Sequence, residues 1–194
     1  MNTSRELLRD YSDEALMLLV RDGDHKAFEE LLRRYEKQLL SFFYRLTSDY
    51  DGAKDLVMDV FLKLYQAAAR YEPRAKFSTY IYQIARNLSI NEFNKRQFRK
   101  TSSLDEMDEE DGIEIAGNEP NAMEIMERQE KQQMVQMALN SLNEEQRTIL
   151  ILTEYQGLPI DRVAQIMGCS VGTIKSRMFR ARQRIKEWMV EHGL

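Results

Sequence analysis

Residues 158–184, LPIDRVAQIMGCSVGTIKSRMFRARQR, decide the fold of the carboxyl-terminal part of this chain. Pro159 suits the first turn of a helix, and Gly168 suits the left-handed conformation that ends one. Ser170 is a typical N-cap residue and begins a second, basic helix. A short helix, a tight turn and a second helix predict a helix-turn-helix, a motif that places its second helix in the major groove of DNA.

The second helix is predicted to have one buried face and one face for DNA, since successive residues are rotated by about 100°. The buried face consists of Val171, Ile174, Met178, Ala181 and Ile185. The opposite face consists of Gly172, Ser176, Phe179, Arg180 and Gln183, flanked by Lys175 and Arg182 on one side and by Arg177 and Arg184 on the other. From Ser170 through Lys186 the sequence contains six basic residues and no acid, whereas a merely solvated helix usually mixes both signs of charge. We therefore predict phosphate contacts from the flanks and base contacts from the centre.

The length and charge of the chain limit the number of domains and the kinds of partner that it can have. The chain has 194 residues and is 43% hydrophobic, which is enough for one or two small domains with cores. No run of about 18 apolar residues predicts a membrane span, and the amino terminus does not resemble a secretory signal, so we expect a cytoplasmic protein without membrane insertion. The net charge is −4, but Asp105 to Glu119 alone holds eight acids and no base. The rest of the chain is net positive, as a nucleic-acid binder requires.

The residues that usually carry catalysis or bind metals are sparse. The lone cysteine, Cys169, cannot form an internal disulfide and is interpreted as structural. His25 and His192 have no neighbouring cysteine or acid at metal-ligand spacing. The sequence contains no Gly-rich phosphate loop and no nucleophile near a plausible histidine base. We therefore expect no enzymatic activity, no cofactor, no metal and no small-molecule substrate.

Helical periodicity extends over most of the chain and predicts an all-α fold. The expected helices cover residues 14–20, 27–46, 53–69 and 78–93 in the first half, and 121–142, 144–155 and the helix-turn-helix in the second. Asn143 and Gln146 form a capping-box pattern. The polar, acidic stretch between the halves has no sustained periodicity and predicts a flexible linker. The expected domains are 10–98 and 121–194, two small helical domains joined by the linker 99–120.

The segment 74–87 interleaves aromatic and basic residues. Phe77, Tyr80 and Tyr82 suit stacking on unpaired bases, while neighbouring cations such as Arg74 and Lys76 suit the phosphate backbone. The same aromatic residues at the start of a helix equally suit core packing, so both interpretations stay open. On the following helix, the apolar face consists of Ile81, Ile84, Ala85 and Leu88, and the polar face of Gln83, Arg86, Asn87, Ile90 and Asn94.

The segment 55–65 is the third informative stretch and predicts an amphipathic helix. Asp55 and Asp59 lie on one exposed edge, while Leu56, Val60, Phe61 and Leu64 are available for packing. An acidic helix edge suits docking to a basic protein surface, although many such edges are simply solvated.

Together these segments resemble the extracytoplasmic-function sigma factors of bacterial RNA polymerase, over nearly the whole chain apart from the linker. Residues 55–62, DLVMDVFL, resemble the region 2 helix that binds the clamp of the largest polymerase subunit. Residues 76–80, KFSTY, through 85–87, ARN, resemble the segment that recognises the minus-ten element. Residues 142–147, LNEEQR, with 168–177 and 180–182, resemble region 4, which binds the minus-thirty-five element and the polymerase flap. Members often have Gln where Met58 stands and Trp where Tyr80 stands.

The resemblance implies roles for individual residues. The implied minus-ten contacts are Arg74, Lys76, Phe77, Tyr80, Tyr82, Gln83, Arg86 and Asn87. The implied minus-thirty-five contacts are Thr173, Lys175, Ser176, Arg177, Phe179, Arg180, Gln183 and Arg184. The implied polymerase contacts are Asp55, Met58, Asp59 and Phe61.

The resemblance also implies a function and its partners. An alternative sigma factor binds core RNA polymerase and promoter DNA, takes the minus-ten element as an unpaired strand, and is held inactive by an anti-sigma factor. The alternative hypothesis is a stand-alone helix-turn-helix regulator that binds duplex DNA without polymerase. Such a regulator usually carries an α/β receiver domain, and the sequence shows no alternating strand pattern of any length.

Overall fold

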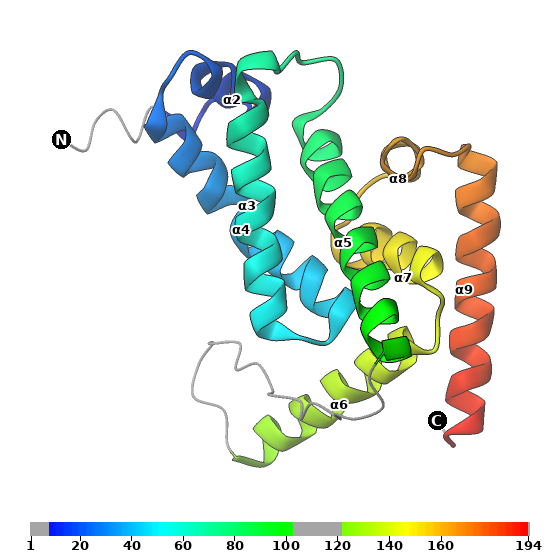
Figure 1. The fold of residues 1–194 in the computed structure, drawn as a ribbon. Coiled ribbons are helices and arrows are strands. Elements are labelled where there is room, and N and C mark those ends of the chain that lie inside the picture. Colours follow the sequence, from blue (N-terminus) through cyan, green and yellow to red (C-terminus); the bar gives the residue numbers. More distant parts are fainter. Residues whose placement is uncertain (1–7, 103–121, 194) are drawn as a thin grey trace.

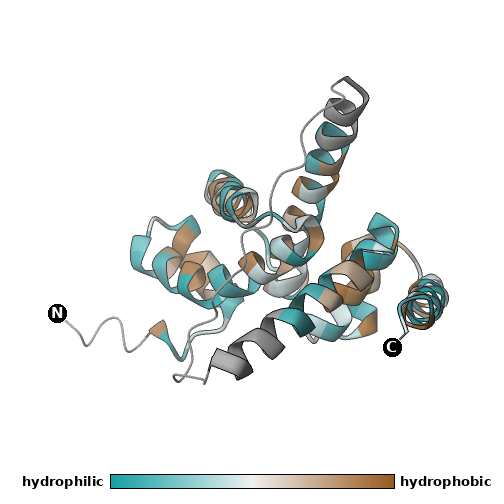
Figure 2. Cartoon of the chain, turned by 90° about the horizontal axis from the view of Figure 1, so that it is seen from below, coloured by the Kyte–Doolittle hydropathy of each residue, from teal (hydrophilic) through white to brown (hydrophobic). Residues whose placement is uncertain are grey.

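The computed structural model describes residues 8–102 and 122–193, and the side chains of residues 8–95 and 130–193. Every regular element within these ranges is helical (Figure 1). The prediction of an all-α fold is confirmed. Figure 2 shows hydrophobic and polar residues alternating around the helices, as amphipathic helices that bury one face require.

The first half consists of α2 (Asp13–Arg21), α3 (His25–Thr47), α4 (Tyr50–Ala67), the short 3-10 helix η1 (Ala68–Arg70) and α5 (Phe77–Ser102). Side-chain caps fix where these helices begin. Ser12 accepts a hydrogen bond from the Ala15 N–H at the start of α2, and Asp24 caps α3 in the same way. Ser48 ends α3 in the left-handed conformation, with φ of 56°.

The second half consists of α6 (Ala122–Asn140), α7 (Glu144–Leu150), the π-helical turn η2 (Ile151–Tyr155), α8 (Ile160–Met167) and α9 (Val171–Glu191). Asn143 accepts a hydrogen bond from the Gln146 N–H at 2.9 Å, so the predicted cap of α7 is confirmed. The π-helical turn was not predicted. In it, the Gln156 N–H donates to the Ile151 carbonyl, one residue further back than in an α-helix.

Helix α3 lies at the centre of the first half and contacts α2, α4 and α5. Aromatic rings fill the space between these helices. The rings of Tyr35 and Phe77 are 5.3 Å apart, and those of Phe42 and Tyr82 are 5.6 Å apart, both edge to face. This packing fixes α5, which carries the predicted minus-ten segment, against α3.

The hydrophobic core of the first half extends into the second half. The core cluster of the first half continues through buried residues of the second, among them Ile151, Leu152, Val163 and Met167. Helix α5 contacts α8, and α3 contacts α6, α7 and η2 (Figure 1). Amphipathic patterning shows which face of a helix is buried but not what covers it, so the sequence did not predict this packing.

The predicted linker falls mostly outside the described residues. Helix α5 continues to Ser102, so residues 99–102, which were predicted to begin the linker, are helical. Residues 103–121 lie outside the described part of the chain, and the domain boundaries stay predictions.

Candidate nucleic-acid interface

The segment that decided the sequence analysis forms a helix-turn-helix. Helix α8 ends at Met167, and its C-cap Gly168 has a left-handed φ of 66°. Helix α9 begins three residues after Gly168. The Ser170 hydroxyl accepts a hydrogen bond from the Thr173 N–H at 3.1 Å and so caps α9. The predicted turn and cap are confirmed. Pro159 precedes the first residue of α8 and occupies the N-cap position instead of the first turn.

The exposed face of α9 is the one that the sequence predicted. Gly172, Ser176, Phe179, Arg180 and Gln183 are all exposed. Phe179 is 72% exposed, which is unusual for so large an apolar side chain. On the opposite face, the structure buries Ile174, Met178 and Ala181 and half-buries Ile185, but Val171 is 40% exposed. Val171 was predicted to be buried, and this was wrong because the first turn of α9 extends beyond the core.

The cations of α9 differ in their partners. Arg177 pairs with Glu145 at 3.2 Å, and Arg182 pairs with Glu154 at 2.6 Å. Arg184 approaches acidic residues of its own helix, Glu187 and Glu191, both at 3.6 Å. Lys175 and Arg180 are exposed and, within the described residues, have no acidic partner. Among the cations predicted to contact the minus-thirty-five element, these two are therefore the ones most available to a DNA ligand.

The amino-terminal end of α5 is held by a carboxylate from α2. The Phe77 N–H donates to Glu14 Oε1 at 2.9 Å. Burial raises the pKa of Glu14, but hydrogen bonds such as this one and the nearby Lys76 lower it, and the net shift is downward. Glu14 therefore fixes the position of the predicted minus-ten segment. The sequence did not single out Glu14, because its partner is 63 residues away.

The structure divides the predicted minus-ten residues by exposure. Arg74, Lys76 and Asn87 are exposed; Tyr80, Gln83 and Arg86 are half-buried; Phe77 and Tyr82 are buried. Phe77 is fully buried among the rings of Tyr35, Tyr71 and Tyr80. The structure therefore supports core packing for Phe77. In this conformation, the Phe77 ring is not available to stack on a base.

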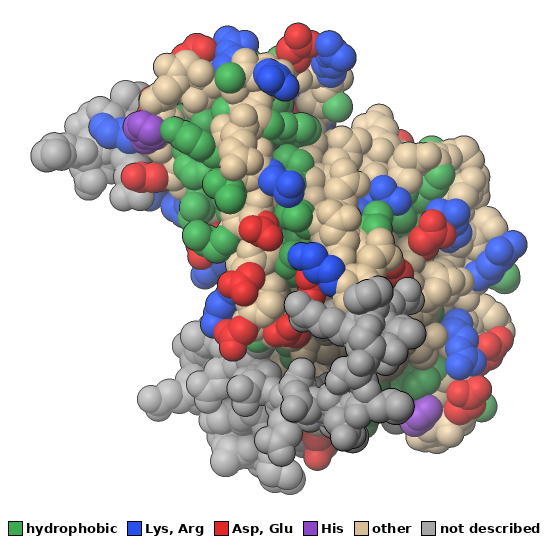
Figure 3. Space-filling view, in the orientation of Figure 1, with side chains coloured by type: hydrophobic (Ala, Val, Ile, Leu, Met, Phe, Trp, Pro, Cys, Tyr) green, Lys and Arg blue, Asp and Glu red, His purple; other side chains and the backbone are tan. Residues whose placement is uncertain are grey.

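Helix α4 presents the predicted docking edge. Asp55, Met58 and Asp59 are exposed, and Met58 is 67% exposed. Phe61, predicted as a partner contact, is instead 4% exposed and packs edge-on against Phe28 with 6.0 Å between ring centres. Phe61 as a polymerase contact therefore stays a prediction, and its ring is buried in this structure. Figure 3 shows hydrophobic side chains gathered over this part of the molecule.

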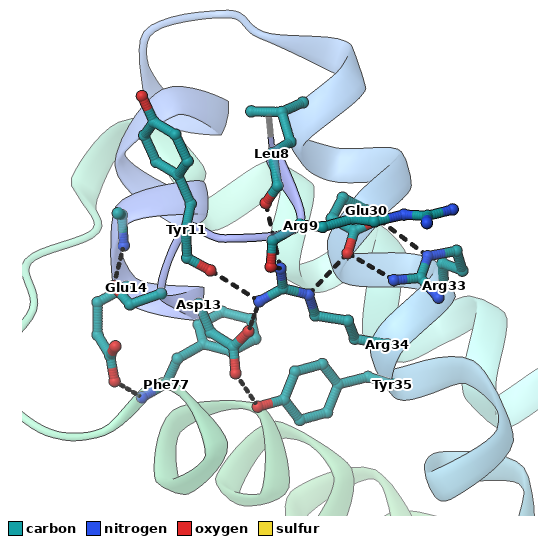
Figure 4. A network of polar contacts seen from close by, with 12 residues as sticks. Leu8, Arg9, Tyr11, Asp13, Glu14, Glu30, Arg33, Arg34, Tyr35 and Phe77 are labelled. Atoms are coloured by element: carbon teal, nitrogen blue, oxygen red, sulfur yellow. Dashed lines mark hydrogen bonds and ion pairs between the residues drawn. The ribbon is translucent and has the colours of Figure 1, made fainter. Parts of the chain in front are cut away.

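A polar network connects residues 8–13 to α3 (Figure 4). The Arg34 guanidinium donates to the carbonyl oxygens of residues 8, 9 and 11 and pairs with Asp13 at 2.7 Å. Glu30 pairs with Arg33 at 2.7 Å and with Arg34 at 2.8 Å. The hydrogen bond from Arg33, followed by that from Arg34, lowers the pKa of Glu30 to about 2 although burial opposes the shift. Tyr35 completes the network by donating to Asp13 at 2.6 Å. No pattern in the sequence predicts this network.

Within the described ranges, no group of three metal-ligating side chains is arranged to hold an ion. In the same residues, no helix combines the length and the apolar character needed to cross a membrane.

Comparison with known proteins accounts for both halves of the chain. Residues 31–99 match the family model of sigma-70 region 2, and residues 132–185 match that of sigma-70 region 4. The ECF RNA polymerase sigma-E factor of Escherichia coli K12 is 34% identical over 177 residues, covering 90% of this chain and 92% of that protein. The chain belongs to the extracytoplasmic-function sigma factors of the sigma-70 family. It is therefore an alternative sigma factor that directs transcription, and members of its family are DNA-binding initiation factors and not enzymes.

Further relatives agree with this assignment. The RNA polymerase sigma-H factor of Pseudomonas aeruginosa is 32% identical over 184 residues, covering 92% of this sigma factor and 94% of its own length. The solved structure of the sigma factor RpoE in complex with the anti-sigma factor NepR, from Bartonella quintana, matches with a TM-score of 0.67 and 30% identity, covering 84% of this chain and 96% of that one. The structure of CnrH with the cytosolic domain of CnrY matches with a TM-score of 0.69, covering 93% and 99% of the two chains, but its 19% identity supports the fold alone.

Proposed function

We propose that region 4 of this sigma factor recognises the minus-thirty-five element with the exposed face of α9, while region 2 takes the minus-ten element as an unpaired strand. The observation that carries the proposal is the outer face of α9. Phe179 is 72% exposed there. Its neighbour Arg180 is also exposed and has no acidic partner among the described residues. Arginine hydrogen-bonds guanine in the major groove, and an apolar ring suits the thymine methyl group.

The flanks of α9 hold the helix against the DNA backbone in this proposal. Lys175 has no acidic partner within the described residues and contacts a phosphate directly. Arg177 is held by Glu145, so it contributes positive charge from a fixed position. Arg177→Ala is therefore expected to weaken duplex binding by a similar amount on all sequences. Loss of a base contact would instead relax the sequence preference at one base pair.

In region 2, the proposed minus-ten surface is built around the start of α5. Arg74 and Lys76 are exposed and Tyr80 is half-buried, so two cations and a partly accessible ring lie close together in the chain. Cations that hold phosphates beside a ring that stacks on a base are the combination that binds single strands. The buried ring of Phe77 packs against the ring of Tyr80, with 6.4 Å between their centres.

The proposed partners are core RNA polymerase and an anti-sigma factor, and the proposed place of action is the cytoplasm. The exposed acids Asp55 and Asp59, together with Met58, supply the surface of α4 for the polymerase clamp; the polymerase flap is the proposed partner of region 4. An anti-sigma partner is supported by the RpoE–NepR complex, in which the sigma factor is 30% identical to this chain.

The decisive experiment is in vitro transcription from a library of genomic fragments with bacterial core polymerase, with and without the protein. New RNA starts that share two motifs at a fixed spacing are the expected result. Arg180→Ala should change which upstream motifs are used, while Lys186→Ala, which removes an exposed cation elsewhere on α9, should not. No new starts, with the protein alone shifting duplex DNA, would support the stand-alone regulator.

A further inference from the structure

Two carboxylates from outside α9 hold arginines on its two flanks. Glu145, in the first turn of α7, pairs with Arg177 at 3.2 Å. Glu154, in the π-helical turn η2, accepts a hydrogen bond from the Arg182 guanidinium at 2.6 Å. Arg177 and Arg182 lie on either side of the outer face of α9, because successive residues of a helix are rotated by about 100°. An acid therefore lies beside the DNA-binding face on each flank.

Ion pairs divide the basic side chains of α9 into two groups of three. The paired group consists of Arg177, Arg182 and Arg184. The other group is exposed and has no acidic partner within the described residues, and it consists of Lys175, Arg180 and Lys186. Arg184 approaches acids of its own helix. In the described part of the chain, the fold of region 4 therefore adds acids to α9 only at Arg177 and Arg182.

The position of both acids is set by packing within the fold. Helix α7, which carries Glu145, packs against α9 (Figure 1). Glu154 is followed by Tyr155, whose ring centre lies 3.8 Å from the guanidinium of Arg45 in α3. Two consecutive residues of the π-helical turn thus contact different helices, and such turns occur frequently at functional sites. The contact of Tyr155 with α3 holds this turn, and with it Glu154, beside α9.

These two ion pairs contribute little to the stability of region 4. The exposed fractions of the four side chains lie between 30% and 63%. Water and salt screen pairs that are so exposed, and their net contribution to folding is small. Their larger effect is on a ligand that carries the same sign of charge as the acids, and the phosphate backbone of DNA is such a ligand.

Duplex DNA competes with the two carboxylates for the same guanidinium groups. A cation that neutralises a phosphate releases condensed counterions, and this contribution to affinity is the same for every sequence. An arginine that already has a carboxylate partner gains less from a phosphate, and the phosphates repel the carboxylate itself. The acids therefore weaken contacts with the backbone but do not alter contacts with base edges, which come from the centre of the outer face.

We infer that Glu145 and Glu154 are restraining residues: they compete with DNA phosphates for Arg177 and Arg182 and so weaken the binding of α9 to every duplex alike. The inference rests on the proposed function of α9. It gives the two acids no part in reading bases, so their removal changes affinity and its salt dependence but not sequence preference. The restraint also lowers the fraction of the protein that is held on random DNA, which far outnumbers promoters in a genome.

The test compares duplex binding by the full-length wild-type protein and the double variant Glu145→Gln, Glu154→Gln, which removes both charges and keeps the side-chain shapes. The matched control, Glu36→Gln, Asp161→Asn, makes the same change in net charge. Glu36 and Asp161 are exposed and, within the described residues, pair with no cation of α9. Fluorescence anisotropy of a labelled random-sequence duplex gives the affinity between about 50 and 200 mM salt. Competition with substituted duplexes gives the sequence preference.

The double variant is expected to bind the random duplex about fivefold more tightly at about 100 mM salt, because two exposed ion pairs no longer oppose phosphate contacts. A plot of log affinity against log salt should become steeper by about 1 to 2, since each freed arginine adds up to one phosphate contact. The control should keep the wild-type slope. In an Arg177→Ala, Arg182→Ala background, the glutamine substitutions should tighten binding much less, because the cations that they free are gone.

Binding by the double variant that is no tighter than that of the wild type overturns the inference, because the acids then do not compete with phosphates. Equal tightening in the double variant and the control also overturns it, since net charge alone would account for the change. So does an undiminished effect when the arginines are absent. In each of these outcomes, duplex binding by the wild type leaves the proposed function of α9 in place. A wild-type protein that binds no duplex even at the lowest salt rejects that function and the inference together.

Discussion

Replacing Glu30 with Gln tests whether the network around Arg34 stabilises region 2 through an ionised carboxylate. The pKa of Glu30 falls from 4.5 to about 2 in the folded protein, and its side chain is 2% exposed. Because the folded pKa lies below the unfolded one, the stabilisation is complete above pH 4.5 and is lost as the pH falls toward 2. A pKa shift of this size contributes about 3 kcal/mol to the free energy of unfolding at neutral pH. About 2 kcal/mol of this contribution is lost at pH 3.

Urea denaturation at pH 6 and pH 3, followed by circular dichroism, measures the effect. The wild type is expected to lose about 2 kcal/mol more than Glu30→Gln between the two pH values, because the amide does not titrate. Asp51→Asn is the control, since Asp51 pairs with Lys54 on an exposed surface and such pairs contribute little. Parallel losses of stability in the wild type and Glu30→Gln would refute the reasoning, even if the variant is less stable at both pH values.

Arg180→Ala is expected to weaken recognition at one upstream base pair by about 1–3 kcal/mol in competition assays with substituted duplexes; equal losses on every sequence would exclude Arg180 as a base contact. The double change Asp55→Lys, Asp59→Lys should abolish pull-down of core polymerase while the helical circular dichroism persists, and unimpaired association would place the docking surface elsewhere. Glu14→Ala should lower the free energy of unfolding by about 1 kcal/mol in urea titrations, because the Phe77 N–H loses its acceptor; an unchanged midpoint would mean that water replaces the carboxylate.

Local signals were sufficient to predict where most helices lie. Ser170 and Asn143 each accept a hydrogen bond from an N–H three residues ahead, and Gly168 adopts the left-handed conformation. These features depend on a few neighbouring residues, so the sequence alone predicts them. The same is true of the exposed face of α9, because its position follows from helical periodicity.

The parts that the sequence did not predict depend on contacts between distant residues. The Tyr82–Gln156 hydrogen bond spans 74 residues, and a glutamine on a helix surface gives no indication of a partner. Phe61 and Phe77 were assigned to binding surfaces, yet both are buried. An aromatic residue in an amphipathic pattern suits a core as well as a ligand, and only the surrounding packing distinguishes the two.

The π-helical turn at Ile151–Tyr155 has an evolutionary consequence. An i→i+5 turn holds one residue more than an α-helical turn, so deletion of a single codon within it would restore a regular α-helix and rotate everything that follows by about 100°. The helix-turn-helix would keep its entire sequence, but Gln156 would no longer face Tyr82. Relatives that differ by one residue at this turn are therefore expected to dock region 4 on region 2 in a different orientation, with no substitution in either DNA-binding surface.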